Sequence, residues 1–282
     1  MISKIILGTA NFGKKYGISK KAISNLNIRK ICKYSFKKGI KFLDTASDYK
    51  GNYKIIKKLN KNYVITTKVL PDTKWRDIKF CEKQIRLIQK KINYKKIDTL
   101  FFHDERFLYN KKRCKVVFEN LVQLKKKKFF KNLGVSIYNF NKIKFLINNY
   151  ELDVIQCPFS IFDQRLIKTG AFENMKKKGI KIHVRSIFLQ GILLNKISIK
   201  EKIFNKLKAN IRALNDYAHF KEVSTLDLCL NYVMSYKIDK IVIGFSSLNN
   251  LKEIVSYKKV KNLDYNKFSN ISSKFLDPRK WS

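Results

Sequence analysis

Short runs of apolar residues alternate with amphipathic segments along nearly the whole chain. Eight short strand-like runs are rich in apolar residues, as in buried parallel strands, and they cover residues 5–8, 41–44, 63–68, 97–103, 132–136, 153–156, 180–186 and 240–243. Between them, apolar residues recur every three or four positions, which is the spacing of one helix face. This spacing is clearest over residues 78–92, 114–121 and 226–234. The pattern therefore predicts alternating strands and helices.

Eight strand–helix repeats are typical of a closed (β/α)₈ TIM barrel, because parallel strands are joined by helical crossovers. A chain of 282 residues suits one such domain. No shift in composition and no Pro/Gly/Ser-rich linker divides it, so we expect a single α/β domain over residues 1–282. An open doubly wound sheet is the alternative, but it normally carries a Gly-x-Gly-x-x-Gly turn that this sequence lacks.

Two segments exceed the simple repeat. The stretch from about 195 to 222 is longer than one helix needs, so we expect an extra helix or a lid there. The tail after Val260 is expected to pack over the barrel.

The chain is strongly basic, with 62 Lys and Arg against 21 Asp and Glu and a formal net charge of +41. Such a charge suits nucleic acid or an anionic membrane surface when the cations are clustered. Here the lysines spread over almost every predicted helix, and they accompany many Ile, Asn, Phe and Tyr residues, as an AT-rich coding sequence would give. A compositional bias therefore explains the charge better than a specific nucleic-acid or membrane partner, although the field can draw in an anionic cofactor or substrate.

Five scattered cysteines include no Cys-x-x-Cys pair, so neither a disulfide framework nor a zinc site is predicted. The sequence shows no signal peptide, and no apolar stretch approaches the ~20 residues that span a bilayer. We therefore expect a reducing, cytoplasmic location.

Polar side chains close several of the apolar runs. Asp44, Lys68 and His103 end the second, third and fourth predicted strands, and Tyr49 follows shortly after Asp44. In a (β/α)₈ barrel the carboxyl ends of the strands meet at one rim, where active sites lie. Each residue alone has an ordinary structural explanation, such as a helix cap for Asp44. Together they predict a pocket whose phenol, ammonium, carboxylate and imidazole can protonate a carbonyl oxygen.

These residues and their surroundings resemble the aldo-keto reductase family over nearly the whole chain. The resemblance rests on Gly8-Thr9, Gly39-Ile-Lys-Phe-Leu-Asp-Thr-Ala46 with Tyr49, Thr67-Lys68, the run from Asp98 to His103, Gly134-Val-Ser136, Gln156, Arg185-Ser186 and Ile243-Gly244. It implies an NADPH- or NADH-dependent enzyme that reduces an aldehyde, ketone or sugar carbonyl.

The resemblance also implies roles for the four catalytic candidates. Tyr49 is expected to act as the general acid, although a free phenol has a pKa of ~10 and is weakly acidic at neutral pH. The charge of Lys68 is expected to lower that pKa, and Asp44 to pair with the ammonium and hold it in place. His103 is expected to donate a hydrogen bond that orients the carbonyl.

Further residues are implied to bind the cofactor. Ser136 and Gln156 are expected to hold the nicotinamide carboxamide, and Arg185 lies where many family members stack an aromatic ring on the nicotinamide. Ser186, Leu189 and Gly191 are expected to border the pyrophosphate. The adenosine end is expected to be wrapped by Gly244, Ser246, Ser247, Asn250 and Glu253, and the cofactor-binding set also includes Gly8 and Thr9. No metal site is expected.

The chain departs from the family pattern in three places. The loop after the eighth strand, Ile243 to Leu251, has no basic residue, which leaves open the choice between NADPH and NADH. Tyr49 is followed by Lys50-Gly51-Asn52-Tyr53 instead of the more usual Gly-x-Ser-Glu. His103 is followed by Asp104 and Glu105, which we expect to face solvent and to which we assign no role.

Two other functions compete with the reductase. One is a dinucleotide-binding regulatory or assembly subunit that keeps the site but turns over little, because a fold does not determine activity. The other is a nucleic-acid-binding protein, which charge alone suggests and for which the sequence shows no recognition motif or basic stripe. Substrate identity and oligomeric state lie beyond what the sequence indicates.

Overall fold

The structure is a computed structural model that describes residues 1–13, 22–49, 51–59, 62–94, 97–194, 202–269, 271–272 and 275–277. Eight parallel strands close into a barrel in which each strand pairs with its neighbours in sequence, and β8 pairs with β1. The strands are β1 (Ile5–Gly8), β2 (Phe42–Asp44), β3 (Val64–Val69), β4 (Ile97–Phe102), β5 (Phe130–Ser136), β6 (Val154–Pro158), β7 (Lys181–Arg185) and β8 (Lys240–Gly244). The predicted (β/α)₈ barrel is confirmed.

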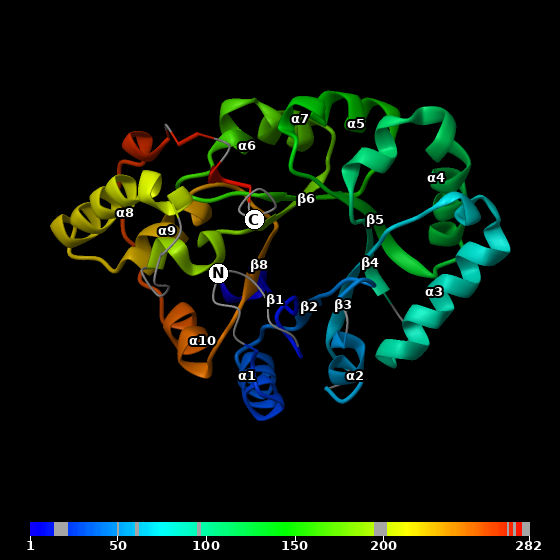
Figure 1. The fold of residues 1–282 in the computed structure, drawn as a ribbon, viewed down its shortest axis with the longest axis horizontal. Helices are drawn as coiled ribbons and strands as arrows, with labels where there is room; N and C mark the ends of the chain where they lie inside the picture. The colour runs from blue at the N-terminus through cyan, green and yellow to red at the C-terminus, as the bar shows by residue number, and fades with distance from the viewer. Residues whose placement is uncertain are drawn as a thin grey trace.

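Helices surround the barrel (Figure 1). They are α1 (Asn25–Lys37), α2 (Asn52–Ile56), α3 (Ile78–Ile92), α4 (Lys111–Lys126), α5 (Ile143–Asn149), α6 (Arg165–Lys168), α7 (Ala171–Lys177), α8 (Lys202–Phe220), α9 (Thr225–Met234) and α10 (Leu248–Val255). The apolar positions that predicted α3 are its buried face, since Cys81, Ile85, Ile88 and Ile92 are buried.

Side-chain caps begin the longer helices. The Ser24 side chain accepts from the N–H of Asn27 at the start of α1, and Asn110 and Ser224 cap α4 and α9 in the same way. Such a cap satisfies a backbone N–H that has no partner inside the helix. Gly39, just after α1, has a φ of 85°, a left-handed conformation that glycine adopts without strain.

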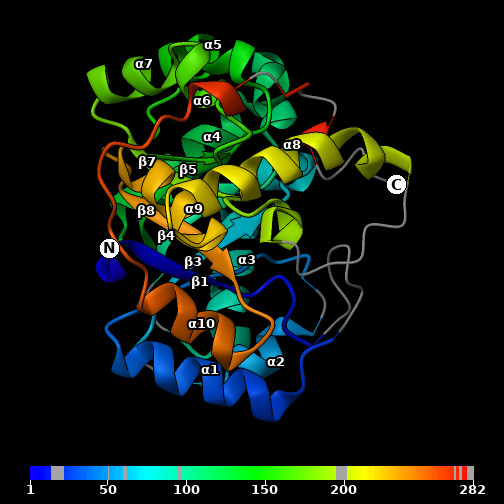
Figure 2. The same ribbon diagram turned by 90° about the vertical axis from the view of Figure 1, so that its left-hand side faces the viewer.

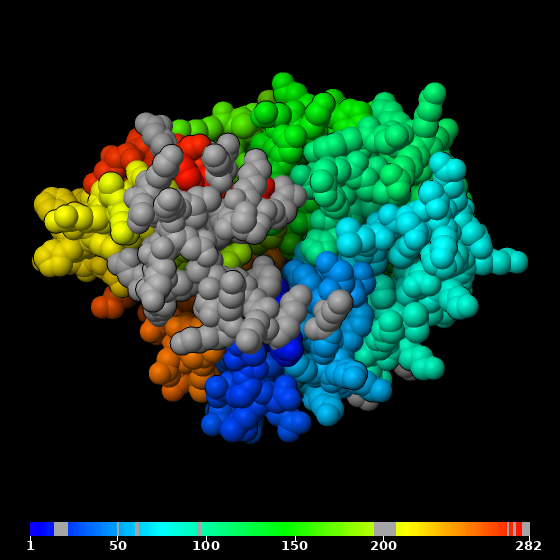
Figure 3. All heavy atoms as spheres, in the orientation of Figure 1, coloured from blue at the N-terminus to red at the C-terminus, as the bar shows by residue number. Residues whose placement is uncertain are grey.

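The first and last helices of the barrel pack together where β8 pairs with β1. Helix α10 contacts α1, and the space-filling view shows the orange atoms of α10 beside the blue atoms of α1 at the lower edge (Figure 3). Neighbouring strands are in a register that brings Gly8 opposite Asp44 and Gly244, and Ser136 opposite Gln156. The carboxyl ends of the strands therefore meet at one rim.

Two features lie outside the simple repeat. Helix α8 precedes α9 between β7 and β8, within the segment 195–222 for which an extra helix or lid was expected, and it crosses the side of the barrel (Figure 2). Residues 195–201 of that segment lie outside the described residues. In the tail, Phe268 and Leu276 are buried, and the carbonyl of Tyr265 accepts from Gln164 Nε2 just before α6. Residues 270, 273–274 and 278–282 of the tail lie outside the described residues.

All five cysteines are buried free thiols, as expected for small side chains that pack among apolar neighbours. None of the described helices combines the length and the apolar character that crossing a lipid bilayer requires.

Candidate active site

A buried ion pair lies where β2 and β3 end. The Lys68 ammonium donates to Oδ2 of Asp44, and the two residues are only 2% and 3% exposed. The second carboxylate oxygen, Oδ1, accepts from Thr66 Oγ1 and from Gln156 Nε2, each at 3.0 Å. Each Asp44 oxygen is therefore held by a donor from a neighbouring or facing strand, and this fixes both charges within the barrel.

Opposing effects act on the pKa of Lys68. Burial lowers the pKa of Lys68 below its ordinary value, because a low-dielectric surrounding disfavours the charged form. The Asp44 carboxylate raises the pKa in return, and the Arg185 guanidinium lowers it further. The net direction is downward, so the ammonium depends on Asp44 to keep its charge.

Tyr49 and His103 lie above this pair, closer to solvent. Lys68 Nζ is 5.9 Å from the centre of the Tyr49 ring. The Tyr49 and His103 rings meet edge to face, with centroids 5.9 Å apart and an interplanar angle of 74°. The structure thus joins all four predicted catalytic residues in one continuous set of contacts.

The loop after β2 is tied to the neighbouring strands by its backbone. The N–H of Thr45 donates to Thr66 O, and the N–H of Ser47 donates to Lys68 O. These bonds hold the loop that carries Tyr49 against β3. The N–H of His103 donates to Val69 O, also on β3.

Asp48 is a contact of the site that the sequence did not reveal. Its Oδ1 lies 3.0 Å from Nδ1 of His103, and the side chains are 43% and 23% exposed. Asp48 stands directly before Tyr49 in the loop, and no periodicity marks it. Only the loop conformation brings its carboxylate to the imidazole.

Ser136 and Gln156 lie side by side in the barrel interior, opposite each other in the β5–β6 register, and both are buried. Gln156 donates through Nε2 to Asp44. Its Oε1 is buried and accepts no hydrogen bond from the described residues. A buried amide oxygen without a donor is costly, so this atom is suited to accept from a bound group.

Arg185, at the end of β7, packs on an aromatic ring. Its Cζ lies 3.9 Å from the centre of the Tyr138 ring, and its Nη2 donates to Ile137 O at 3.0 Å. The guanidinium plane therefore has one face on Tyr138, in the loop after β5. Tyr138 is a second neighbour of the site that the sequence did not reveal.

The loop after β7 has an unusual backbone. Ser186, Leu189, Gln190 and Gly191 all have positive φ angles, of 62°, 44°, 57° and 93°. Non-glycine residues seldom adopt this region, and such strain is concentrated at functional sites. The N–H of Leu189 donates to Ser186 O and that of Gly191 to Phe188 O. Leu189 and Gly191 thus satisfy their own N–H groups within the loop.

The loop between β8 and α10 carries the predicted adenosine-binding residues. Ser247 caps α10, since its side chain accepts from the N–H of Asn250. Ser246 Oγ donates to Asn250 Oδ1 at 2.7 Å, while Gly244 and Glu253 are exposed. This loop is organised by its own polar side chains.

Gly8 and Thr9, at the end of β1, lie beside the backbone of Asp44. Thr9 is fully buried, and its hydroxyl and its N–H both donate to Asp44 O. Gly8 packs against β8, where an added Cβ would lie 3.2 Å from Val242 Cγ1. Thr9 therefore fixes the backbone of Asp44.

The expectation that Asp104 and Glu105 face solvent is wrong for Glu105. Its side chain is 3% exposed, and its Oε1 accepts from the N–H groups of Tyr138 and Asn139. Asp104 is partly exposed and is held by Arg106. A carboxylate can accept from two N–H groups at once, and here one oxygen accepts from two successive N–H groups of the β5–α5 loop. Glu105 thus joins the loops that follow β4 and β5.

A buried histidine lies in the barrel interior beneath the site. His183 on β7 is 4% exposed, its ring meets Phe101 edge to face at 6.0 Å, and its Nδ1 bonds to none of the described residues. Burial lowers the pKa of His183 from 6.5 to about 4, although the Asp44 carboxylate acts in the opposite direction. His183 is therefore neutral at physiological pH.

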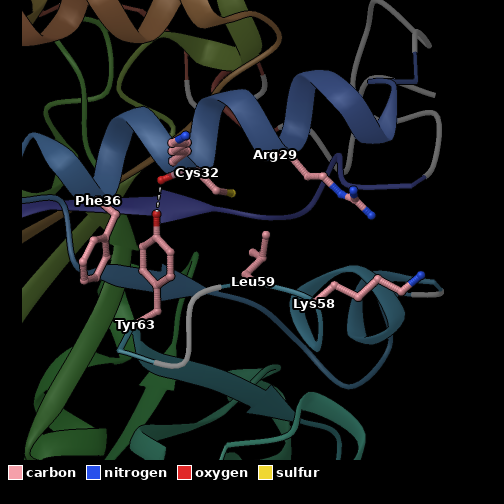
Figure 4. A pocket seen from close by; sticks show the side chains of 7 residues that line it. Arg29, Cys32, Phe36, Lys58, Leu59 and Tyr63 are labelled. Atoms are coloured by element: carbon pink, nitrogen blue, oxygen red, sulfur yellow. Dashed lines mark hydrogen bonds between the residues drawn. The ribbon is translucent and has the colours of Figure 1, made fainter.

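A separate cavity of about 270 Å³ lies between α1 and the segment that leads into β3. Figure 4 shows the Tyr63 hydroxyl directed at the backbone of α1, where it donates to Cys32 O at 2.6 Å. Arg29, Lys33 and Lys58 line the cavity beside apolar side chains. None of its lining residues is a predicted site residue, so the cavity is distinct from the catalytic candidates.

Comparison with known proteins agrees with this arrangement. The sequence profile described as Aldo/keto reductase family matches residues 4–275, whereas a search of curated proteins gave no match. The chain is similar in structure to an aldo-keto reductase from Bacillus halodurans in its holo form, with a TM-score of 0.76, 18% identity and coverage of 95% of this chain and 92% of that chain. It is also similar to a glycerol dehydrogenase from Gluconobacter oxydans, with a TM-score of 0.72, 16% identity and coverage of 94% and 89%.

Proposed function

The chain belongs to the aldo/keto reductase family, and from that premise we propose that it reduces an aldehyde, a ketone or a sugar carbonyl to the alcohol with NADPH or NADH. The observation that carries this proposal is the continuous set of contacts from Asp44 through Lys68 and Tyr49 to His103. A bound nicotinamide would supply the hydride that the carbonyl carbon takes up. The residues of this chain supply the proton and the positioning.

The carboxamide site fits such a cofactor. Gln156 Oε1 is a buried acceptor to which none of the described residues donates, and the amide N–H₂ of a nicotinamide is a donor of the required kind. Asp44 holds the other end of the Gln156 amide, so Oε1 is fixed in orientation. Ser136 lies beside it, with a hydroxyl that can bond to the same carboxamide.

Arg185 can take the place of the aromatic ring that many family members stack on the nicotinamide. A guanidinium is planar and has two faces, one of which packs on Tyr138. The proposal requires the other face to receive the flat nicotinamide ring. The positive charge of Arg185 favours the uncharged, reduced form of the cofactor over the cationic, oxidised form.

Tyr49 is the proposed proton donor. The Lys68 ammonium lies 5.9 Å from the centre of the Tyr49 ring, and this positive charge would make release of the phenol proton easier. Lys68 keeps its charge because Asp44 is bound to it. His103, whose side chain is more exposed than those of the buried pair, is the proposed group that orients the carbonyl oxygen.

The proposal is tested by following the loss of reduced dinucleotide with a panel of aldehydes, ketones and sugars. NADPH and NADH are tested in parallel, because the loop from Ile243 to Leu251 contains no basic residue that would select the 2′-phosphate. Tyr49→Phe is expected to lower kcat by about 10²–10⁴-fold, the usual contribution of a general acid, with dinucleotide binding unchanged.

Tyr257→Phe is the matched control, because Tyr257 lies beside Met1 and Ile2 at the amino-terminal end of β1, away from the rim that carries the site. It is expected to keep wild-type turnover. Tight dinucleotide binding with no turnover of any carbonyl by the wild type would instead support a regulatory or assembly subunit.

A further inference from the structure

The cavity between α1 and the segment that leads into β3 has an apolar end and a cationic end. Figure 4 shows Phe36 and Tyr63 at one end, whereas the side chains of Arg29 and Lys58 extend together at the other. The volume of about 270 Å³ is close to the lower limit for small-molecule sites, which begin at about 300 Å³. The cavity therefore suits one small ligand with two chemically different ends.

The apolar end offers aromatic rings to a ligand. The Phe36 and Tyr63 rings meet edge to face, with centroids 5.1 Å apart. The Tyr63 hydroxyl is already engaged, since it donates to Cys32 O at 2.6 Å and lies 2.7 Å from Ser35 Oγ. Burial raises the pKa of the Cys32 thiol to about 12, so this thiol is uncharged at neutral pH. A flat apolar ring is the group that such surroundings favour.

The cationic end offers charges to a ligand. Arg29, Lys33 and Lys58 line the cavity, and Arg29 and Lys33 are one turn apart on α1. All three residues are exposed, and none of them forms an ion pair with a residue that the structure describes. A guanidinium can bind a carboxylate through two parallel hydrogen bonds. A carboxylate is therefore the head group that this end favours.

The surrounding sequence supplies no acid that neutralises these cations. Residues 1–71 contain 17 Lys and Arg and only two acids, Asp44 and Asp48. Both acids lie at the candidate active site, where Asp44 is bound to Lys68 and Asp48 Oδ1 lies 3.0 Å from His103 Nδ1. The positive charge beside the cavity is therefore open to an anion from outside the chain.

We propose that this cavity binds a small aromatic carboxylate, with its ring against Phe36 and Tyr63 and its carboxylate between Arg29 and Lys58. Contacts with the two rings hold the ligand, and the two charges set its direction. The site does not rest on the proposed reductase function, because none of the four catalytic candidates lines the cavity.

The test is isothermal titration calorimetry with 2-naphthoate in about 0.15 M salt, which screens attraction to the general positive field of the protein. One equivalent is expected to bind with a Kd of about 0.1 mM, which is usual for a ligand of this size. The uncharged analogue 2-naphthamide is expected to bind at least about tenfold more weakly, because it forms no ion pair. Equal binding of the amide would overturn the proposal.

Decanoate tests the preference for a ring, since it is a carboxylate with a flexible chain. It is expected to bind at least about tenfold more weakly than 2-naphthoate, because it loses torsional freedom and forms no ring contact. Decanoate binding as tight as that of 2-naphthoate would overturn the aromatic class.

The variant Arg29→Gln/Lys58→Gln tests the cationic end. Each lost ion pair is expected to weaken binding of 2-naphthoate by up to about fivefold, as for exposed pairs. The matched control is Lys30→Gln/Lys37→Gln, which removes the same charge from exposed positions of α1 that do not line the cavity. The control is expected to keep wild-type affinity, and an equal loss in both variants would overturn the proposal.

The variant Leu59→Trp tests the location, because Figure 4 shows Leu59 between the two ends of the cavity, where a larger ring would take the place of the ligand. It is expected to abolish binding and to remove the rise in Tm that 2-naphthoate gives the wild type. Tyr49→Phe, which lies outside the cavity, is expected to bind 2-naphthoate as the wild type does. Unchanged affinity in Leu59→Trp, or loss of binding in Tyr49→Phe, would place the ligand elsewhere and overturn the proposal. The glutamine variants change only exposed residues, so the test stands even if Leu59→Trp unfolds.

Discussion

Acid should destabilise the protein through one buried imidazole. His183 lies inside the barrel with its Nδ1 unbonded among the described residues, and burial lowers its pKa from 6.5 to about 4. Between these values the unfolded chain binds a proton that the folded chain does not. Unfolding is therefore favoured as the pH falls. The stability is complete above pH 6.5 and declines as the pH approaches 4.

The size of the effect follows from the two pKa values. One pKa unit corresponds to about 1.4 kcal/mol, so the free energy of unfolding should fall by about 1.4 kcal/mol at about pH 5.5 and by about 2.5 kcal/mol at about pH 4.5, relative to about pH 8. A loss of this size is a large part of the stability of a typical domain.

The assay is urea unfolding of the wild type and His183→Gln over this pH range. Glutamine is similar in size and does not titrate, so the difference between the two proteins isolates the imidazole from all other acid-sensitive groups. His219→Gln, at the exposed end of α8, serves as the matched control. Parallel pH dependence in the wild type and His183→Gln would refute the reasoning.

Two further predictions concern stability. Lys68→Met should lower the free energy of unfolding by about 3–5 kcal/mol, because it leaves the Asp44 carboxylate buried without its cation. The double variant with Asp44→Asn should recover most of that loss, and additive losses in urea unfolding would contradict the pairing. Gly134→Ala should cost about 1–3 kcal/mol, since its Cβ would lie 2.5 Å from Val154 O and 2.7 Å from the Phe101 ring. Gly244→Ala, whose Cβ meets nothing within 4 Å, should melt close to the wild type, and an equal loss at both glycines would argue against the packing explanation.

The barrel was predictable because its strands are short runs rich in apolar residues, and three of them end at a polar residue, namely Asp44, Ser136 and Arg185. Small errors at the strand limits have simple causes. Strand β5 starts at Phe130 and not at 132, because the exposed Lys131 interrupts the apolar run. Strand β6 continues to Pro158, which pairs with Arg185 at the strand end, where a missing N–H costs little.

The environment of the candidate residues was less predictable, because it depends on loops and on distant pairs. Gln156 and Asp44 are 112 positions apart in sequence and still share a hydrogen bond. Asp48 reaches His103 only through the conformation of the loop after β2. Glu105 looks like a surface acid in the sequence, and its burial follows from two N–H groups on another loop. Residue types at strand ends indicate a site, whereas contacts between loops require the fold.

The bridge from Glu105 to the N–H groups of Tyr138 and Asn139 has a consequence for protein engineering. The loops after β4 and β5 share one carboxylate, so neither is an independent module. A graft that replaces the first loop alone leaves two backbone N–H groups of the second loop without their acceptor. A graft that replaces the second loop alone leaves the buried Glu105 carboxylate without its two donors. New substrate preferences are therefore best introduced by transplanting the two loops together from one donor protein.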